Sequence, residues 1–293
     1  MSNKIHLAGI IPVANMSTNL DLHIPAVMLP ISHNWTAIQK SVFECAMAGC
    51  NTIWIVANDD LAPLVRKVIG DWIYDPVYLS GYSKFSSEQR KEIPIYYAQI
   101  NPKDRDRRDS YGWSALYGAY SAWKVANRIS QWITPDKYYV SFPMAIYDIY
   151  HIRDCRKQIN HRCDNFFLSY DGETVKDNKP LAFTFTGEDF KQCRRSVNKL
   201  TTREYLPPSP DSPYPNQKLP LRERWSARHF DLQTVFQKVT TKNSTTLNVD
   251  WYYDISDWEE YKKFLGSSFS IKIPDRELTK ARKHVTIPYN SEG

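Results

Sequence analysis

Runs of apolar residues near the start of the chain predict a strand, a helix and a second strand. Residues 5–13 and 52–57 are nearly all apolar, which is typical of strands that are covered on both faces. Between them, apolar residues recur at helical spacing: Ile38, Val42, Phe43 and Ala46. Gly49 is suited to end that helix. Because parallel strands are joined by a right-handed crossover, residues 5–58 predict one unit of a parallel sheet.

The same alternation of strands and helices continues along the chain. Further strands are predicted at residues 93–100, 138–142, 166–170, 181–185 and 247–255. The pattern predicts an α/β fold with a mostly parallel, doubly wound sheet. In such sheets, ligands bind at the carboxyl ends of the strands.

Helices are predicted at residues 61–69, 111–132, 188–200 and 256–265. In the second of these, Leu116, Tyr120, Trp123 and Ile129 are expected to face inward. Ser256 is predicted to cap the last helix. Residues 71–90 and 101–109 are predicted to be loops.

A cluster of prolines divides the second half of the chain. Residues 206–220 contain six prolines, and such a segment is expected to be extended and semi-rigid. We therefore predict an α/β core at residues 1–205, a Pro-rich strap at 206–220, and a C-terminal α+β extension at 221–293 that packs on the core and completes it.

Composition and charge restrict the possible environments. The 293 residues are 14% aromatic, which is typical of a globular protein and excludes a disordered one. The net charge of +6 permits an anionic partner. No apolar stretch reaches the roughly 20 residues of a membrane span, and five Cys without a regular spacing fit a reducing compartment. We expect a cytoplasmic protein that does not bind membranes; the oligomeric state stays open.

The first unit also resembles a known family. The segments HLAGIIPVAN, HIPAVMLPI and AGCNTIWIVAND resemble the start of sugar-phosphate nucleotidyltransferases. In kind, the chain is most similar to nucleotidyltransferase-like proteins of tailed phages, T4-like marine phages in particular. The resemblance implies a nucleotide-diphospho-sugar transferase (GT-A-like) fold, a nucleotide or nucleotide sugar as ligand, Mg²⁺ as cofactor, and the host cytoplasm as location.

The resemblance also implies a set of site residues. Gly9 stands where the family's Gly-rich phosphate loop begins, and Gly112 and Ser114 stand at a turn that meets the base. Asp254, together with Asp148, corresponds to the catalytic carboxylates that hold the metal in the family. For Asp254, a role as a helix-proximal cap is the alternative.

The chain departs from the family at the phosphate loop. Ile10, Ile11 and Pro12 replace the next glycine and a Thr-Arg pair, and Pro25-Ala26 replaces Pro-Lys. Pro12 has no N–H group to offer a phosphate.

A charged segment can supply the missing positive charge. Arg105, Arg107 and Arg108 are expected to face phosphates through bidentate contacts. Alternatively, they pair with Asp104, Asp106 and Asp109 on a solvated loop.

A second basic segment lies further on. It contains Lys191, Arg194, Arg195, Lys199 and Arg203. Aromatic residues follow and interleave with later arginines, a pattern that suits single-stranded nucleic acid or a nucleotide; a solvated charged face is the alternative.

Three functions are consistent with these patterns. The first is nucleotidyl transfer to a sugar phosphate, or handling of a nucleotide sugar, with Mg²⁺. The second is a GT-A glycosyltransferase that decorates phage DNA or another acceptor. The third is a catalytically degenerate phage binding or virion-associated protein.

Overall fold

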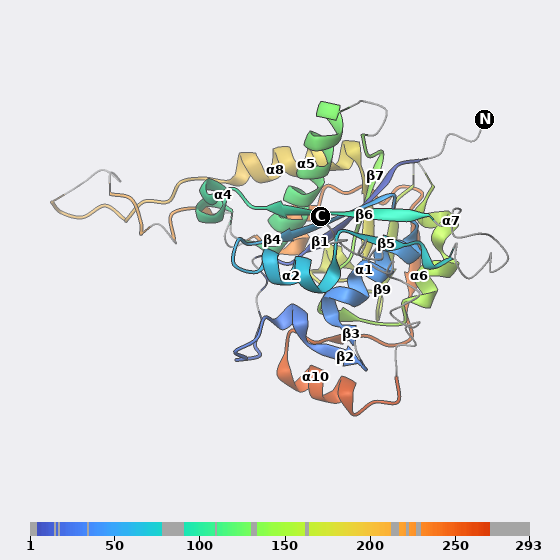
Figure 1. The fold of residues 1–293 in the computed structure, drawn as a ribbon. Helices are drawn as coiled ribbons and strands as arrows, with labels where there is room; N and C mark the ends of the chain where they lie inside the picture. Colours follow the sequence, from blue (N-terminus) through green and yellow to red (C-terminus); the bar gives the residue numbers. More distant parts are fainter. Residues whose placement is uncertain are drawn as a thin grey trace, which may run out of the picture.

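A mostly parallel sheet of eight strands forms the centre of the molecule (Figure 1). The computed structural model describes residues 5–14, 16, 18–33, 35–77, 91–108, 110–129, 134–161, 164–211, 217–220, 223–226 and 230–269. The strand order is β11-β9-β10-β7-β1-β4-β6-β5. The bounds are β1 (Leu7–Pro12), β4 (Thr52–Ala57), β5 (Trp72–Tyr74), β6 (Glu92–Gln99), β7 (Lys137–Val140), β9 (Phe166–Ser169), β10 (Phe183–Thr186) and β11 (Thr245–Asn248).

The sheet contains two antiparallel strands. β7, β1, β4 and β6 pair in parallel, whereas β10 and β5 run against their neighbours. From β1 the chain first builds outward through β4 to β6 and then returns to place β7 on the other side of β1. The topological switch point, where doubly wound sheets bind ligands, therefore lies between β1 and β7.

Two helices cover opposite faces of β1 because consecutive strand residues point to opposite sides. A Cβ atom added to Gly9 would lie 2.9 Å from Sγ of Cys45 in α1 (Ala37–Ala48). A Cβ atom added to Gly118 in α5 (Tyr111–Ile129) would lie 2.6 Å from Cγ2 of Ile10. The sheet is thus sandwiched between helices that approach it closely.

The remaining helices join these two layers. α8 (Gly187–Leu200) and α9 (Leu232–Phe236) contact α5, and α6 (Tyr150–Asp154) and α7 (Arg156–Ile159) contact α1. Figure 1 shows α5 and α8 on one side of the sheet and α1 and α2 (Ala62–Ile69) on the other. Short elements complete the list: η1 (Ala26–Met28), β2 (Pro30–Ser32), β3 (Trp35–Thr36), α4 (Pro102–Arg107), β8 (Ala145–Ile146), η4 (Val175–Asp177), β12 (Tyr253–Asp254) and α10 (Trp258–Leu265).

This architecture confirms the predicted α/β class and the mostly parallel sheet. The parallel pairing of β1 with β4 through α1 is the predicted first unit, and Gly49 ends α1 with a φ of 91°. Among the described residues, no helix is long and apolar enough to cross a membrane.

Four local predictions were wrong. Most of the predicted loop 101–109 forms α4, and the predicted strand 247–255 divides into β11 and β12. Asp257, not Ser256, caps α10, because its side chain accepts hydrogen bonds from the N–H groups of Glu259 and Glu260. Trp123 and Ile129 are 36% and 71% exposed, because the buried face of the second half of α5 consists of Ala119, Ala122 and Ala126.

Other parts of the chain are only partly described. The predicted loop 71–90 begins with β5, and residues 78–90 lie outside the described residues. The segment after α8 forms an extended arm whose two limbs touch at the bridges Arg203–Trp225 and Tyr205–Lys218 (Figure 1).

Candidate functional site

Several segments meet at the carboxyl ends of β1 and β7. The N–H of Ser141, which follows β7, donates to the carbonyl of Ile10 in β1 at 3.0 Å. The ring of Tyr111, at the start of α5, lies 5.2 Å from the ring of Phe142. The Ser114 hydroxyl donates to the carbonyl of Ala14 at 2.8 Å. The start of α5 is therefore fixed against the topological switch point.

Asp254 approaches the same place from the C-terminal part. It lies in β12, which pairs with β8 so that Asp254 is opposite Ala145. The N–H of Ile255 donates to the carbonyl of Met144 at 2.9 Å. One carboxylate oxygen of Asp254, Oδ1, accepts the N–H of Ser256 at 3.0 Å, so the residue also has the predicted capping type of contact.

Three buried hydroxyl groups at these segments have no hydrogen-bond partner among the described residues. They belong to Tyr111, Ser141 and Tyr252. A buried polar group without a partner is costly, so these three hydroxyls need a partner from outside the described residues, such as a ligand or a water molecule.

Burial and the charge of Asp254 keep the two phenols protonated. Burial is the main cause that raises the pKa of Tyr111 well above its usual value, and the nearby Asp254 carboxylate raises it further. Burial likewise raises the pKa of Tyr252, again with a contribution from Asp254. At neutral pH both phenols are therefore available as hydrogen-bond donors.

Lys179, which the sequence did not single out, lies beside the rings of Tyr170 and Tyr252. Nζ of Lys179 lies 4.8 Å from the centre of the Tyr170 ring and 5.6 Å from that of Tyr252. It also forms an ion pair with Glu173 at 2.6 Å. Lys179 lies 75 residues before Asp254 in the sequence. The pairing of β11 with β9 brings the two regions together.

A fully buried ion pair supports the strand opposite Asp254. Lys40 and Glu44, one turn apart on α1, are 2.5 Å apart with no exposed side-chain surface. Lys40 also donates to the carbonyl of Ala145 at 2.7 Å, and Glu44 accepts the hydroxyls of Tyr139 and Tyr147 at 2.6 and 2.7 Å. Since Ala145 pairs with Asp254, Lys40 and Glu44 act as positioning residues for this carboxylate.

The structure places the other predicted residues away from a ligand-facing position. Gly9 lies in the middle of β1, where its missing side chain makes room for Cys45 and Cys50 of the α1 side. Gly112 lies in α5, where an added Cβ would be 2.8 Å from Val235. The Ser114 hydroxyl already donates a hydrogen bond to the carbonyl of Ala14. These three small residues permit close packing within the protein.

The three arginines of the charged segment diverge. Arg105 pairs with Asp59 at 2.6 Å, and Arg108 pairs with Asp104 at 3.2 Å. Arg107 lies over the Trp225 ring of the arm at 4.9 Å. Burial lowers the pKa of Arg108, an effect that Asp104 opposes and Arg107 and Arg194 reinforce. Arg108 thus pairs with Asp104, one of the carboxylates predicted for it. Arg105 instead pairs with Asp59, which follows the end of β4.

Magnesium is the ion that the fold implies, and the carboxylates here can meet only part of its requirement. Asp148 lies beyond the end of β8, and its Oδ1 accepts the N–H of Tyr150 at the start of α6. Among the described residues no three His, Cys, Asp or Glu side chains form a cluster. Mg²⁺ is commonly held by one or two carboxylates together with substrate phosphates. Asp254 fits that arrangement, in which the substrate supplies most of the ligands.

Known proteins resemble this chain in fold. No family model matches the sequence, and no curated protein matches it. A structure described as a glucose-1-phosphate thymidylyltransferase from Bacillus anthracis is similar with a TM-score of 0.52 and 9% identity, over 89% of this chain and 94% of that chain.

Two further structures have TM-scores of 0.49. One is a nucleoside-diphosphate-sugar pyrophosphorylase from Vibrio cholerae, 13% identical over 88% of this chain and 100% of that chain. The other is a UDP-glucose pyrophosphorylase complexed with UDP-glucose, 12% identical over 89% and 97%. The similarity with a TM-score of 0.52 shows that the chain has the fold of the sugar-phosphate nucleotidyltransferases.

Proposed function

We propose that the carboxyl ends of β1 and β7, together with β12, form a site that binds a nucleotide and a sugar phosphate, or the nucleotide sugar formed from them, and transfers the nucleotidyl group. The observation that supports this most is the group of unpartnered buried hydroxyls of Tyr111, Ser141 and Tyr252 beside Asp254. They lie at the point of the fold where doubly wound sheets bind ligands. The phage origin and the cytoplasmic location belong to the same proposal and come from the sequence resemblance.

In this proposal the side chains position the reactants and balance their charge. The sugar phosphate oxygen attacks the α-phosphorus of the nucleoside triphosphate, and pyrophosphate leaves. Lys179 contacts a phosphate, and the phenols of Tyr111 and Tyr252 donate to phosphate or sugar oxygens. Asp254 and the substrate phosphates would hold Mg²⁺, which would supply electrostatic stabilisation at the α-phosphate of the transferred nucleotidyl group. Such reactions depend on positioning and charge neutralisation and need no covalent intermediate.

Release of pyrophosphate tests the proposal. The protein is incubated with each common nucleoside triphosphate, a set of sugar 1-phosphates and Mg²⁺. We expect Asp254→Asn and Lys179→Met each to lower the rate roughly a hundredfold or more. Glu259→Gln, which removes an exposed carboxylate on α10, is the matched control and should change nothing. Equal rates for Asp254→Asn and the wild type would contradict the assignment of Asp254.

A second candidate is recognition of a nucleotide sugar without nucleotidyl transfer. It is favoured by β1, which stays a regular strand through Pro12, so no glycine-rich loop with free N–H groups follows Gly9. A nucleotide sugar that raises the melting temperature, with no pyrophosphate released from any triphosphate, would support this candidate. Consumption of that nucleotide sugar with an acceptor would instead indicate a glycosyltransferase.

A further inference from the structure

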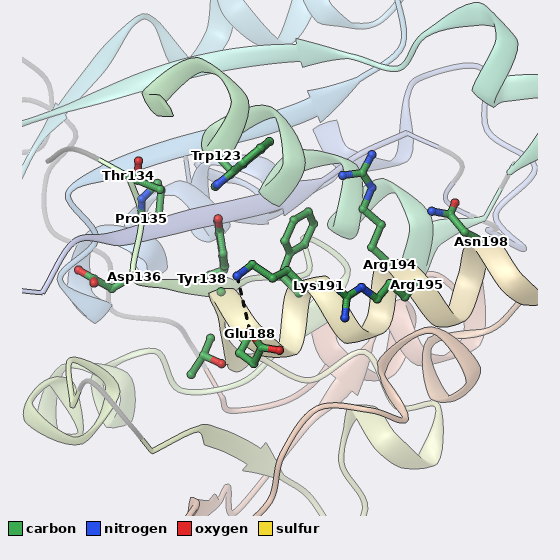
Figure 2. A pocket seen from close by; sticks show the side chains of 13 residues that line it. Trp123, Thr134, Pro135, Asp136, Tyr138, Glu188, Lys191, Arg194, Arg195 and Asn198 are labelled. Atoms are coloured by element: carbon green, nitrogen blue, oxygen red, sulfur yellow. Dashed lines mark ion pairs between the residues drawn. The ribbon is translucent and has the colours of Figure 1, made fainter. Parts of the chain in front are cut away.

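A cavity of about 840 Å³ lies between α5 and α8, at the amino end of β7 (Figure 2). Trp123 of α5 and Tyr138 of β7 line it, and α8 contributes Phe190, Lys191, Arg194 and Arg195. The N–H of Gly187, at the start of α8, donates to the carbonyl of Asp136, just before β7. The cavity therefore faces the amino edge of the parallel strands, whereas Asp254 lies at their carboxyl edge.

The floor of the cavity contains an unsatisfied hydroxyl. Tyr138 is fully buried, and its hydroxyl has no partner among the residues that the structure describes. Figure 2 shows this hydroxyl directed toward Trp123, into the space beside α8. Burial raises the pKa of Tyr138, so the phenol stays protonated at neutral pH and can donate to a ligand. A second hydroxyl at the rim, that of Thr134, is also without a partner in the described part of the chain.

The α8 wall of the cavity carries excess positive charge. Lys191 forms an ion pair with Glu188 at 3.6 Å, which balances both groups. Arg194 lies 4.3 Å above the Tyr120 ring, and neither it nor Arg195 pairs with a carboxylate within the described ranges. Asp136, the other acid of the lining, accepts the N–H of His6 at 3.0 Å. Figure 2 shows the two side chains leaving α8 in different directions, with Arg194 directed toward α5. Each of them offers a guanidinium group without a carboxylate partner in the described part of the chain.

We propose that this cavity is a second ligand site that binds a single nucleotide, with the base against Trp123 above the Tyr138 hydroxyl and the phosphate on a guanidinium group of α8, which Arg194 and Arg195 supply. Aromatic walls suit a nucleobase, and guanidinium groups suit phosphate oxygens. The volume is within the range of small-molecule sites. A nucleic acid strand would require a row of aromatic platforms, and this cavity presents one partly exposed ring, that of Trp123.

Binding measurements with the full chain test this cavity separately from the proposed site at Asp254. Equilibrium dialysis is carried out with ATP, CTP, GTP, UTP, dTTP, their monophosphates, inorganic phosphate and a ten-residue oligothymidylate. The variants are Trp123→Ala, Tyr138→Phe and the pair Arg194→Ala with Arg195→Ala. Lys199→Ala, an exposed residue of the same helix outside the lining, is the control. Melting temperatures establish that each variant is folded.

We expect at least one nucleotide to bind, and the arginine pair variant to bind it about tenfold or more weakly. Trp123→Ala should weaken binding by about five- to a hundredfold, and Tyr138→Phe by severalfold. Lys199→Ala and Asp254→Asn should leave this binding unchanged, which separates the site from the proposed function.

Four results would overturn the inference. The first is nucleotide binding that is lost in Asp254→Asn and kept in the arginine pair variant. The second is inorganic phosphate that binds as tightly as every nucleotide, because the aromatic wall would then have no role. The third is oligothymidylate that binds more tightly than every mononucleotide. Absence of any arginine-dependent binding would overturn it equally.

Discussion

Tyr252 and Tyr147 both carry buried phenolic hydroxyls, but within the described part of the chain the hydroxyl of Tyr147 alone has a hydrogen-bond partner. The Tyr147 hydroxyl donates to Glu44 at 2.7 Å, whereas the Tyr252 hydroxyl has no partner among the described residues. This difference separates a structural tyrosine from one that a ligand would complete.

We predict opposite stability effects for the two Phe substitutions. Tyr252→Phe removes an unsatisfied group, so the free energy of unfolding should stay unchanged or rise by about 1 kcal/mol, while affinity for a nucleotide sugar should fall. Tyr147→Phe removes a hydrogen bond to a charged group and should lower stability by about 1.5–3 kcal/mol. Urea denaturation measures both. A marked loss of stability in Tyr252→Phe would indicate a structural role instead.

The buried pair of Lys40 and Glu44 allows a second prediction for single residues. Lys40→Met leaves the Glu44 carboxylate buried without its cation, so we expect a loss of about 3–5 kcal/mol in the free energy of unfolding. Lys40→Met combined with Glu44→Gln removes the unpaired charge and should recover part of the loss. A double variant that is less stable than the sum of both single variants would contradict this explanation.

At the scale of elements, sequence patterns predicted those whose apolar residues form an unbroken run or recur at helical spacing. Residues 53–57 are such a run and are buried, and the apolar residues of α1 recur at helical spacing, so the strand and the helix were evident. The pattern failed where contacts from distant residues decide the outcome. Residues 247–255 were predicted as one strand, although Asn248, Asp250 and Asp254 interrupt their apolar residues. They divide because β11 pairs with β9 and β12 pairs with β8.

The candidate site was predictable only in part for the same reason. Asp254 and the edge of the sheet followed from the resemblance and from the rule for doubly wound folds. Lys179 and the phenols of Tyr111 and Tyr252 carry no local signal, because their proximity arises from the return of the chain through β11 and β12. Gly9 marks a close approach between β1 and α1, and its place in the sequence alone suggested a phosphate loop.

The contact of α5 with the sheet yields a prediction at this scale. An alanine at position 118 would place Cβ 2.6 Å from Ile10 and 2.7 Å from Val56, both branched residues of central strands. We expect the overpacking, about 1–3 kcal/mol, to exceed the roughly 1 kcal/mol that alanine gains over glycine in a helix. Thermal unfolding would show a lower melting temperature. The control, Gly266→Ala, has only ordinary contacts and should be nearly neutral.

For the whole molecule, buried tyrosines set the behaviour in alkali. The pKa values of five phenols are raised mainly by burial: Tyr111, Tyr138, Tyr139, Tyr147 and Tyr252. The folded state keeps these protons at pH values where the unfolded chain, with a tyrosine pKa of about 10, loses them. Their contribution to stability is therefore complete below about pH 10 and is lost as the pH rises further.

We predict that stability falls steeply above about pH 10, by as much as about 1.4 kcal/mol per pH unit for each of these phenols. The lowered pKa of Lys40 acts in the opposite direction up to about pH 10.5, but it is a single group. Urea midpoints at about pH 9 and about pH 11 measure the fall, and ultraviolet absorbance of phenolate should rise together with unfolding. A stability that does not change over this interval would contradict the burial of these hydroxyls.

The position of β11 and β12 in the chain also affects how the protein is made. Residues 245–248 form an outer strand of the sheet, and the segment that follows them contributes Asp254 to the candidate site. When only residues 1–240 have left the ribosome, the parallel strands from β1 to β9 are all present. Asp254 and β11, the strand that pairs with β9, are still missing. During synthesis, the nascent chain is therefore expected to collapse early and to acquire any magnesium-dependent chemistry only at the end.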